Sequence, residues 1–149
     1  MKSISVPHNL LAYIREGSTF LIAGHKEPDG DCVGSQLALC SVLTRLGKRA
    51  IPCSAGPFKR PEIAAYAESF TADPLTEKDT RVIIMDCSSL ERTGELELKL
   101  RGLPLAIIDH HASGNTAGHI AFLEPTAPSV TALTLLLIEA LGLEPTREE

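Results

Sequence analysis

The apolar positions of the chain fall into two kinds of segment that alternate along the sequence. Short continuous runs, such as FLIAG at 20–24, are typical of strands that a parallel sheet buries on both faces. Longer segments carry apolar residues at helical spacing and form a wide stripe. The expected strands are 18–24, 48–53, 80–85, 105–108 and 119–123, and the expected helices are 6–15, 33–46, a short one around 62–70, a turn near 91–96, and 128–141.

Local signals at helix ends support this division. Pro128 and Ser129 suit a helix start and Gly142 suits its end, while Ser88 and Ser89 are expected to cap the turn at 91–96. Because strands and helices alternate, right-handed crossovers predict an α/β fold. We expect one domain built on an open, mostly parallel, Rossmann-like sheet of about five strands, with helices on both faces.

Composition narrows the function classes. The formal charge is −5 and the basic residues are scattered, so no basic stripe indicates binding to a long nucleic-acid duplex. The four cysteines form no CxxC pair, which favours free buried thiols in a reducing compartment. The start of the chain lacks the apolar core of a secretion signal, and no apolar run reaches the length of a membrane span. We therefore expect a cytoplasmic protein.

Three of the expected strands end in residues that can bind metal ions. The strand ending at 24 leads into His25, Asp29 and Asp31, the strand at 82–85 leads into Asp86, and the strand at 105–108 leads into Asp109, His110 and His111. In open parallel sheets, sites form just beyond the carboxyl ends of the strands. Taken singly, each aspartate could simply cap the following helix. Together with the histidines, they favour a site for two divalent cations that hold a phosphoryl group.

These segments resemble the motifs of the DHH phosphoesterase superfamily. The matching motifs are HKEPDGDCVGS at 25–35, the aspartate within VIIMDCSS at 82–89, and IDHH at 108–111. The segment PTAPSVTALTLLLIEALG at 125–142 resembles the helix that follows the DHH motif. The pattern is most similar to the oligoribonuclease and 3′-phosphoadenosine 5′-phosphate phosphatase branch. RecJ-type exonucleases, cyclic-dinucleotide phosphodiesterases and family II inorganic pyrophosphatases share the core.

The resemblance implies a ligand set for two Mn²⁺ ions, with Mg²⁺ as a possible substitute. It assigns His25 and Asp29 to the first ion and Asp31 and His110 to the second. Asp86 would bridge the two ions. A water molecule activated between them would then attack phosphorus in line.

Other residues near the motifs receive supporting roles or none. The resemblance places His111 against the substrate phosphate and gives Asp109 the role of orienting the neighbouring imidazoles. Arg92 follows the second motif and could reach a phosphate. Cys32 and Cys87 lie beside ligands, and we expect both thiols to be packing residues.

Polar residues outside the motifs have simpler interpretations. His8 and His119 are expected to be surface histidines or satisfied core histidines. Lys59 and Arg60 could reach a phosphate, but solvation at the surface is favoured.

The resemblance implies a phosphoesterase acting on short oligonucleotides or small nucleotides. The family also has a fourth aspartate ligand and a second, substrate-binding domain, and the chain stops before both. We therefore expect a fragment of a longer protein, with weak or no turnover by itself. Because related proteins are often dimers, a homodimer is one expected assembly. The alternative is a non-catalytic nucleotide-binding or regulatory module of the same fold.

Overall fold

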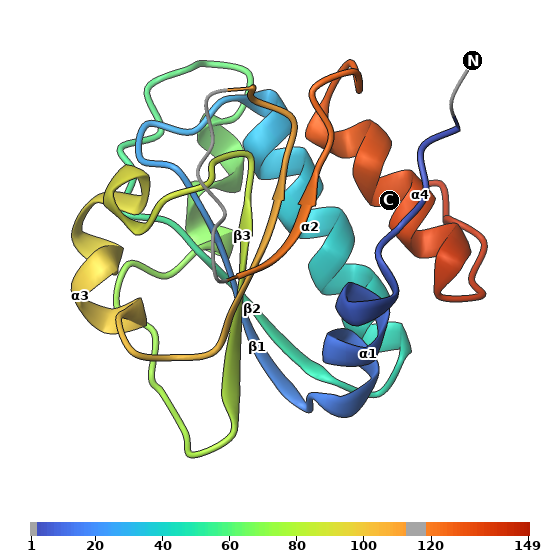
Figure 1. The fold of residues 1–149 in the computed structure, drawn as a ribbon. Coiled ribbons are helices and arrows are strands. Elements are labelled where there is room, and N and C mark those ends of the chain that lie inside the picture. The colour runs from blue at the N-terminus through green and yellow to red at the C-terminus, as the bar shows by residue number, and fades with distance from the viewer. Residues whose placement is uncertain (1–2, 113–118) are drawn as a thin grey trace.

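A five-stranded, entirely parallel sheet with the strand order β2-β1-β3-β4-β5 forms the centre of the molecule (Figure 1). The computed structural model describes residues 3–112 and 119–149. Its strands are β1 (Thr19–Gly24), β2 (Arg49–Cys53), β3 (Thr80–Met85), β4 (Leu105–Asp109) and β5 (Ile120–Leu123). Its helices are α1 (His8–Glu16), α2 (Gly30–Arg45), α3 (Glu97–Leu100) and α4 (Val130–Ala140), with the 3-10 segments η1 (Ala64–Ser69) and η2 (Leu90–Leu96).

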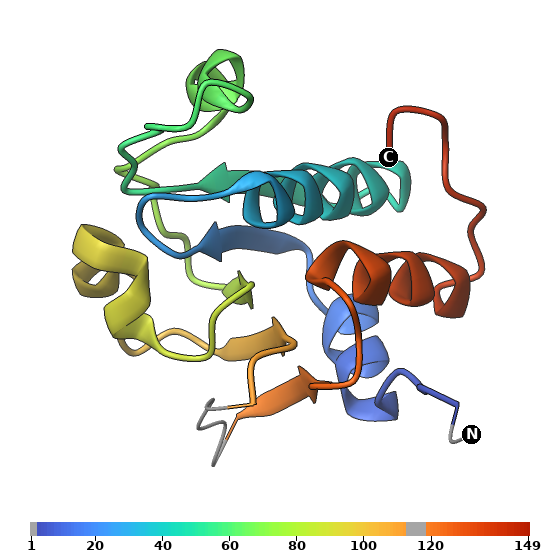
Figure 2. The same cartoon turned by 90° about the horizontal axis from the view of Figure 1, so that it is seen from above.

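The two faces of the sheet are covered unequally (Figure 2). Helices α1, α2 and α4 pack on one face, and the segment containing η2 and α3 lies on the other. Successive side chains of a strand point to opposite faces. Phe20 and Ile22 therefore pack in the core under α1, α2 and α4, and Leu21 and Ala23 pack in the core under η2 and α3. Burial on both faces explains why the strands have continuous apolar sequences, and the predicted fold class is confirmed.

The predicted elements are present, with differences at their ends. Helix α2 begins at Gly30, earlier than the apolar stripe suggested, because the Asp29 side chain accepts a hydrogen bond from the Cys32 N–H and caps the helix. The predicted serine cap of η2 is wrong: Ser89 occupies the N-cap position but makes no capping side-chain bond. Helix α4 has the predicted start, with Ser129 accepting a hydrogen bond from Ala132 N–H.

The direction in which successive strands are added to the sheet reverses between β1 and β3. The chain passes from β1 through α2 to β2 on one side, and later returns to β3, on the other side of β1. The connections on the two sides of this point lie on opposite faces of the sheet, and in open sheets of this kind the ligand crevice is expected outside the carboxyl ends of the two strands, here β1 and β3. Gly24 and Met85 are paired at this end, and the next residues are His25 and Asp86.

Close packing behind the crevice fixes α2 against the sheet. The buried Gln36 side-chain amide donates hydrogen bonds to the carbonyls of Ile22 and Cys53, each at 2.9 Å. A side chain at Gly24 would place Cβ 2.3 Å from Cys32 Sγ and 2.7 Å from Gln36 Oε1, so this position needs glycine. The start of α2 is thereby held at a fixed place beside the strand ends.

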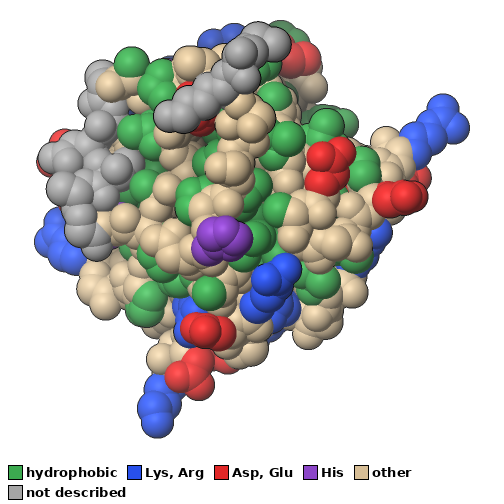
Figure 3. Space-filling model, turned by 45° about the vertical axis from the view of Figure 1, so that its right-hand side comes forward, with side chains coloured by type: hydrophobic (Ala, Val, Ile, Leu, Met, Phe, Trp, Pro, Cys, Tyr) green, Lys and Arg blue, Asp and Glu red, His purple; other side chains and the backbone are tan. Residues whose placement is uncertain are grey.

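The surface carries charges of both signs. On the face shown in Figure 3, basic and acidic side chains are interspersed rather than gathered by sign. Among the described residues, no helix combines the length and apolarity needed to cross a bilayer.

Candidate metal centre

The side chains that follow β1, β3 and β4 converge at the carboxyl edge of the sheet. His25 Nε2 lies 3.3 Å from Asp86 Oδ2 and 3.9 Å from Asp29 Oδ1. His110 Nε2 lies 3.6 Å from Asp86 Oδ1 and 3.8 Å from Asp31 Oδ2. The two Asp86 oxygens therefore face two separate histidine–aspartate pairs. All five residues proposed from the sequence as metal ligands meet here.

Asp86 has the burial, the hydrogen bonding and the backbone conformation expected of a carboxylate that binds a cation. Its side chain is 3% exposed, and its Oδ1 has no hydrogen-bond partner among the described residues. Its backbone adopts a φ of 64°, a left-handed conformation that is uncommon for residues other than glycine and clusters at functional sites. Burying an unpaired carboxylate is costly, and a bound cation removes that cost. The donor atoms of Asp86, His110 and His111 lie within 4.8 Å of one another, a spacing that suits a metal ion.

The pKa values of the site residues reflect how closely its charged groups lie to one another. Burial raises the pKa of Asp86, and the nearby charges of Asp31 and Asp29 raise it further. The hydrogen bond with His25 lowers this pKa, but the net shift is upward. The hydrogen bond to Asp86 raises the pKa of His25, against the opposing effect of burial. Burial also acts to raise the pKa of Asp29, but the Cys32 N–H and the charge of His25 outweigh it, and the net shift is downward.

Backbone carbonyls orient the two ligand histidines. His25 Nδ1 lies 2.8 Å from the carbonyl of Lys26, and His110 Nδ1 lies 3.1 Å from the carbonyl of Ala127. We assign the proton of the neutral ring to Nδ1 in both cases, since only an N–H can donate to a carbonyl. Each Nε2 is then left with a free lone pair facing the aspartates, as metal coordination requires.

Helix capping and metal binding are compatible in this site. Asp29 caps α2, and both Asp31 oxygens accept backbone N–H groups from the first turn of α4. A carboxylate has about four lone-pair positions, so each residue retains positions for a cation. No sequence pattern indicates the contact of Asp31 with α4 or that of His110 with Ala127.

Asp109 acts on the two histidines differently from the expectation. Its Oδ1 lies 2.6 Å from His111 Nδ1, and it accepts the backbone N–H of His110 at 2.8 Å. The Asp109 carboxylate thus contacts one imidazole, that of His111, while Ala127 orients the ring of His110. The two histidine rings lie 4.6 Å apart between centroids.

A cavity of about 260 Å³ opens beside these residues. Its lining includes Asp86, Ser88, Ser89, Arg92, Asp109 and His111, so both residues considered for substrate binding lie on its wall. Lys59 is instead exposed and pairs with Glu27 at 2.8 Å, as expected of a solvated surface residue. Arg60 is also exposed, but its charge contributes to lowering the pKa of Asp29, which the sequence did not indicate.

The thiols beside the ligands are buried and protonated. Burial raises the pKa of Cys87 to about 12 and that of Cys32 further still. The Cys32 thiol donates to Gln36 Oε1 at 3.4 Å, although its sulfur also lies within 4.8 Å of donor atoms of His25 and Asp86. All four cysteines are free and buried, in agreement with the predicted packing role.

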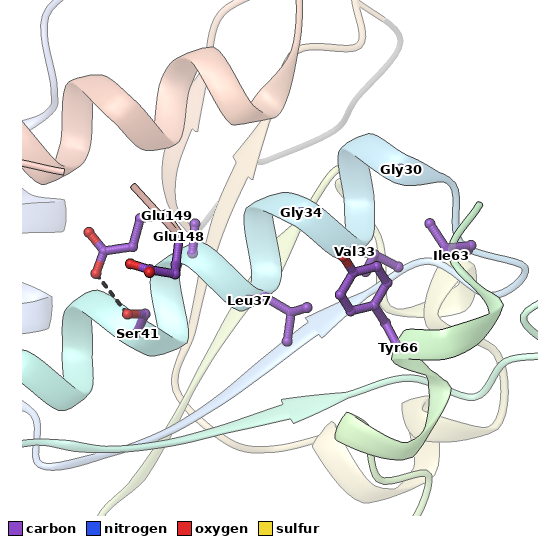
Figure 4. Close-up of a pocket in the computed structure, with 10 residues that line it drawn as sticks. Gly30, Val33, Gly34, Leu37, Ser41, Ile63, Tyr66, Glu148 and Glu149 are labelled. Carbon is purple, nitrogen blue, oxygen red and sulfur yellow. Dashed lines mark hydrogen bonds between the residues drawn. The ribbon is translucent and has the colours of Figure 1, made fainter. Parts of the chain in front are cut away.

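A second hollow, of about 450 Å³, lies along the outer face of α2 (Figure 4). Its walls come from α2, from η1 with the residue before it, and from the end of the chain, where Glu149 accepts a hydrogen bond from Ser41. Its lining contains none of the residues predicted to bind metal or substrate.

The chain is similar in sequence to two kinds of known protein. The chain is 30% identical over 127 residues to the bifunctional oligoribonuclease and PAP phosphatase NrnA of Thermus thermophilus, covering 85% of this chain and 38% of that protein. It is 26% identical over 151 residues to the cyclic-di-AMP phosphodiesterase GdpP of Geobacillus thermodenitrificans, covering 90% of this chain and 23% of that protein. It therefore spans less than half of either relative.

A solved structure shows the same fold, and a family profile identifies the family. An exopolyphosphatase-related protein from Bacteroides fragilis has the same fold, with a TM-score of 0.78 and 21% identity over 90% of this chain and 43% of that one. The sequence profile described as DHH family, N-terminal domain, matches residues 19–149. The chain thus belongs to the DHH family, and its described crevice is formed by that family's N-terminal domain.

Proposed function

We propose that this domain hydrolyses phosphate esters of short oligonucleotides or small nucleotides, with two divalent cations, Mn²⁺ or Mg²⁺, as cofactors. The first ion would be held by His25 and Asp29, the second by Asp31 and His110, and both by Asp86. The observation that carries the proposal is the buried Asp86 carboxylate, whose two oxygens face the two histidines at 3.3 and 3.6 Å. When bound, two such cations activate water for attack on phosphorus and neutralise charge on the phosphoryl oxygens.

The cavity beside the ligands supports a substrate-binding role for His111 and Arg92. Both line its wall, and the bond to Asp109 holds the His111 ring in place. From this wall an imidazole N–H and a guanidinium can donate to phosphate oxygens. These groups would orient the ester and hold its charge, while the buried side of the cavity restricts access of bulk water.

The domain is proposed to work within a longer protein. The chain spans 38% of its NrnA relative and 23% of its GdpP relative. We infer that further residues complete the ligands of the second ion, with a fourth aspartate, and that a second domain binds the rest of the substrate. The choice among substrates would be made there, since the relatives' names differ in substrate while the matched domain is shared.

Metal-dependent hydrolysis tests the proposal. We expect the longer protein that contains this domain to release product from a short oligoribonucleotide or from 3′-phosphoadenosine 5′-phosphate when Mn²⁺ is present, and to stop when a chelator is added. A cyclic dinucleotide serves as the third substrate, because one relative is a cyclic-di-AMP phosphodiesterase. His110→Ala should abolish the reaction. His8→Ala is the matched control, because His8 is exposed and outside the site.

Product release that continues at the same rate after chelation would contradict the proposal. The rival function, a nucleotide-binding module without catalysis, predicts a different pattern. It predicts no product with any of the three substrates, together with a nucleotide affinity that is the same with and without Mn²⁺. Calorimetric titration of the nucleotide under both conditions separates the two functions.

A further inference from the structure

The two histidine–aspartate pairs of the site are supported by different parts of the chain. His25 and Asp29 receive their supporting bonds from Lys26 and Cys32, at most three residues away in the sequence. Asp31 and His110 receive their supporting hydrogen bonds from residues 127–131, which comprise the three residues before α4 and its first two residues. The contacts of Asp31 span 99 and 100 residues, and that of His110 spans 17.

The first turn of α4 directs two of its backbone donors to Asp31. Val130 N–H donates to Oδ2 and Thr131 N–H donates to Oδ1, both at 2.9 Å. The next N–H, of Ala132, is satisfied by Ser129, which caps the helix. With one donor on each oxygen, the Asp31 carboxylate cannot rotate freely. Its Oδ2 is held 3.8 Å from His110 Nε2.

The same segment also fixes His110. The carbonyl of Ala127 accepts from His110 Nδ1 at 3.1 Å and so presents Nε2 to Asp31 and Asp86. The helix itself is anchored by buried apolar side chains, including Val130, Leu133 and Leu137, in the core beneath the sheet. The first turn of α4 and Ala127 just before it therefore set the positions of the two ligands proposed for the second ion.

We propose that the segment Ala127–Thr131 is the positioning element for the second ion, so that binding of this ion is coupled to docking of α4 while binding of the first ion is not. This inference rests on the proposed two-ion site. Supporting contacts of this type typically change metal affinity by about 10- to 100-fold when they are removed. By linkage, the second ion in turn stabilises the first turn of α4 by the same factor.

Val130→Pro tests the proposal because it deletes one donor to Asp31. Val130 is the first helical residue of α4, where proline is favoured, and the preceding Ser129 is already extended at φ −162° and ψ 164°. Val130→Ala is the matched control: it also loses the buried side chain, but it keeps the N–H. Circular dichroism identifies the temperatures at which both variants are folded.

The readouts are calorimetric titration with Mn²⁺ and the Mn²⁺ electron paramagnetic resonance spectrum, which differs between isolated and paired ions. In the longer protein that contains this domain, we expect two ions when residue 130 is valine, and in Val130→Pro a second ion bound at least about tenfold more weakly. The first ion should bind unchanged, and Val130→Ala should keep both affinities and the paired-ion spectrum. Equal weakening in Val130→Pro and Val130→Ala would overturn the inference, since packing alone would explain it. A single ion in the unsubstituted longer protein would instead overturn the two-ion assignment on which the inference rests.

Hydrogen exchange in the unsubstituted chain gives an independent test that does not depend on the folding of a variant. Amide exchange is followed by nuclear magnetic resonance with Mg²⁺, which does not broaden the signals. Exchange of the Val130 and Thr131 amide protons should slow when the second equivalent of Mg²⁺ binds and not when the first equivalent binds. Slowing with the first equivalent, or no slowing at all, would overturn the coupling.

Discussion

Replacing Asp86 with alanine is expected to reduce Mn²⁺-dependent hydrolysis by at least about a thousandfold, because one carboxylate is removed from both ions at once. Its two oxygens lie 3.3 Å from His25 and 3.6 Å from His110, so neither pair retains its shared partner. Deleting a single group that stabilises transition-state charge costs roughly 10²- to 10³-fold, and Asp86 would serve two ions. The rate of product release from a model phosphodiester measures the effect.

Asp86→Asn separates the loss of charge from changes in the backbone. Alanine disfavours the positive φ of 64° found here, whereas asparagine tolerates it and keeps the shape of the side chain. Both variants should lose turnover, while Glu91→Gln, which alters an exposed acid on η2, should not. Hydrolysis by Asp86→Asn at the rate of the unsubstituted protein would show that the carboxylate is not required.

The second large effect is a rise in thermal stability on addition of Mn²⁺. Burial and the charges of Asp31 and Asp29 raise the pKa of Asp86 in the folded state. Because the folded pKa lies above the unfolded one, the metal-free fold loses stability as pH rises from the ordinary aspartate range through the raised pKa. At neutral pH this cost is present, and a bound cation removes it. A single ion at about 100 times its Kd adds about 2.7 kcal/mol, which corresponds to a rise in Tm of roughly 5–11 °C for a chain of this size.

The size of this rise should depend on pH. His25 must lose the proton on Nε2 before it can bind a cation, and its pKa is raised mainly by the hydrogen bond to Asp86. Protons therefore compete with Mn²⁺ below this raised pKa, and the gain in Tm should be larger at pH 8 than at pH 6. Thermal scans at both pH values, with NaCl at matched ionic strength as the control, measure it. A Tm that Mn²⁺ leaves unchanged at pH 8 would contradict the metal assignment.

Much of the fold could be predicted because its strands are buried on both faces. Such strands leave continuous apolar runs, and the run at 80–85 has the bounds of β3. The residue at which helix α2 begins was harder to predict. The stretch from Pro28 to Gly30 suggests a turn. In the structure the Asp29 side chain accepts the Cys32 N–H, and the helix begins at Gly30. Capping is decided by side-chain geometry, which hydrophobic periodicity does not encode.

The ligands were easier to identify than the groups that support them. His25, Asp86 and His110 each follow an apolar strand, and parallel strands bring their carboxyl ends together. The supports are backbone groups, such as the carbonyl of Ala127, and every residue carries one. Whether such a group faces a ligand depends on how α4 docks about a hundred residues after Asp31, and no local pattern records that contact.

Diffraction from Mn²⁺-soaked crystals, with anomalous differences measured at the manganese edge, tests the central claim most directly. We predict two peaks roughly 3.5–4 Å apart. One should lie beside His25 and Asp29, the other beside Asp31 and His110, with an oxygen of Asp86 bound to each. Two peaks that share no Asp86 contact, or Mn²⁺ bound only outside the crevice, would contradict this account.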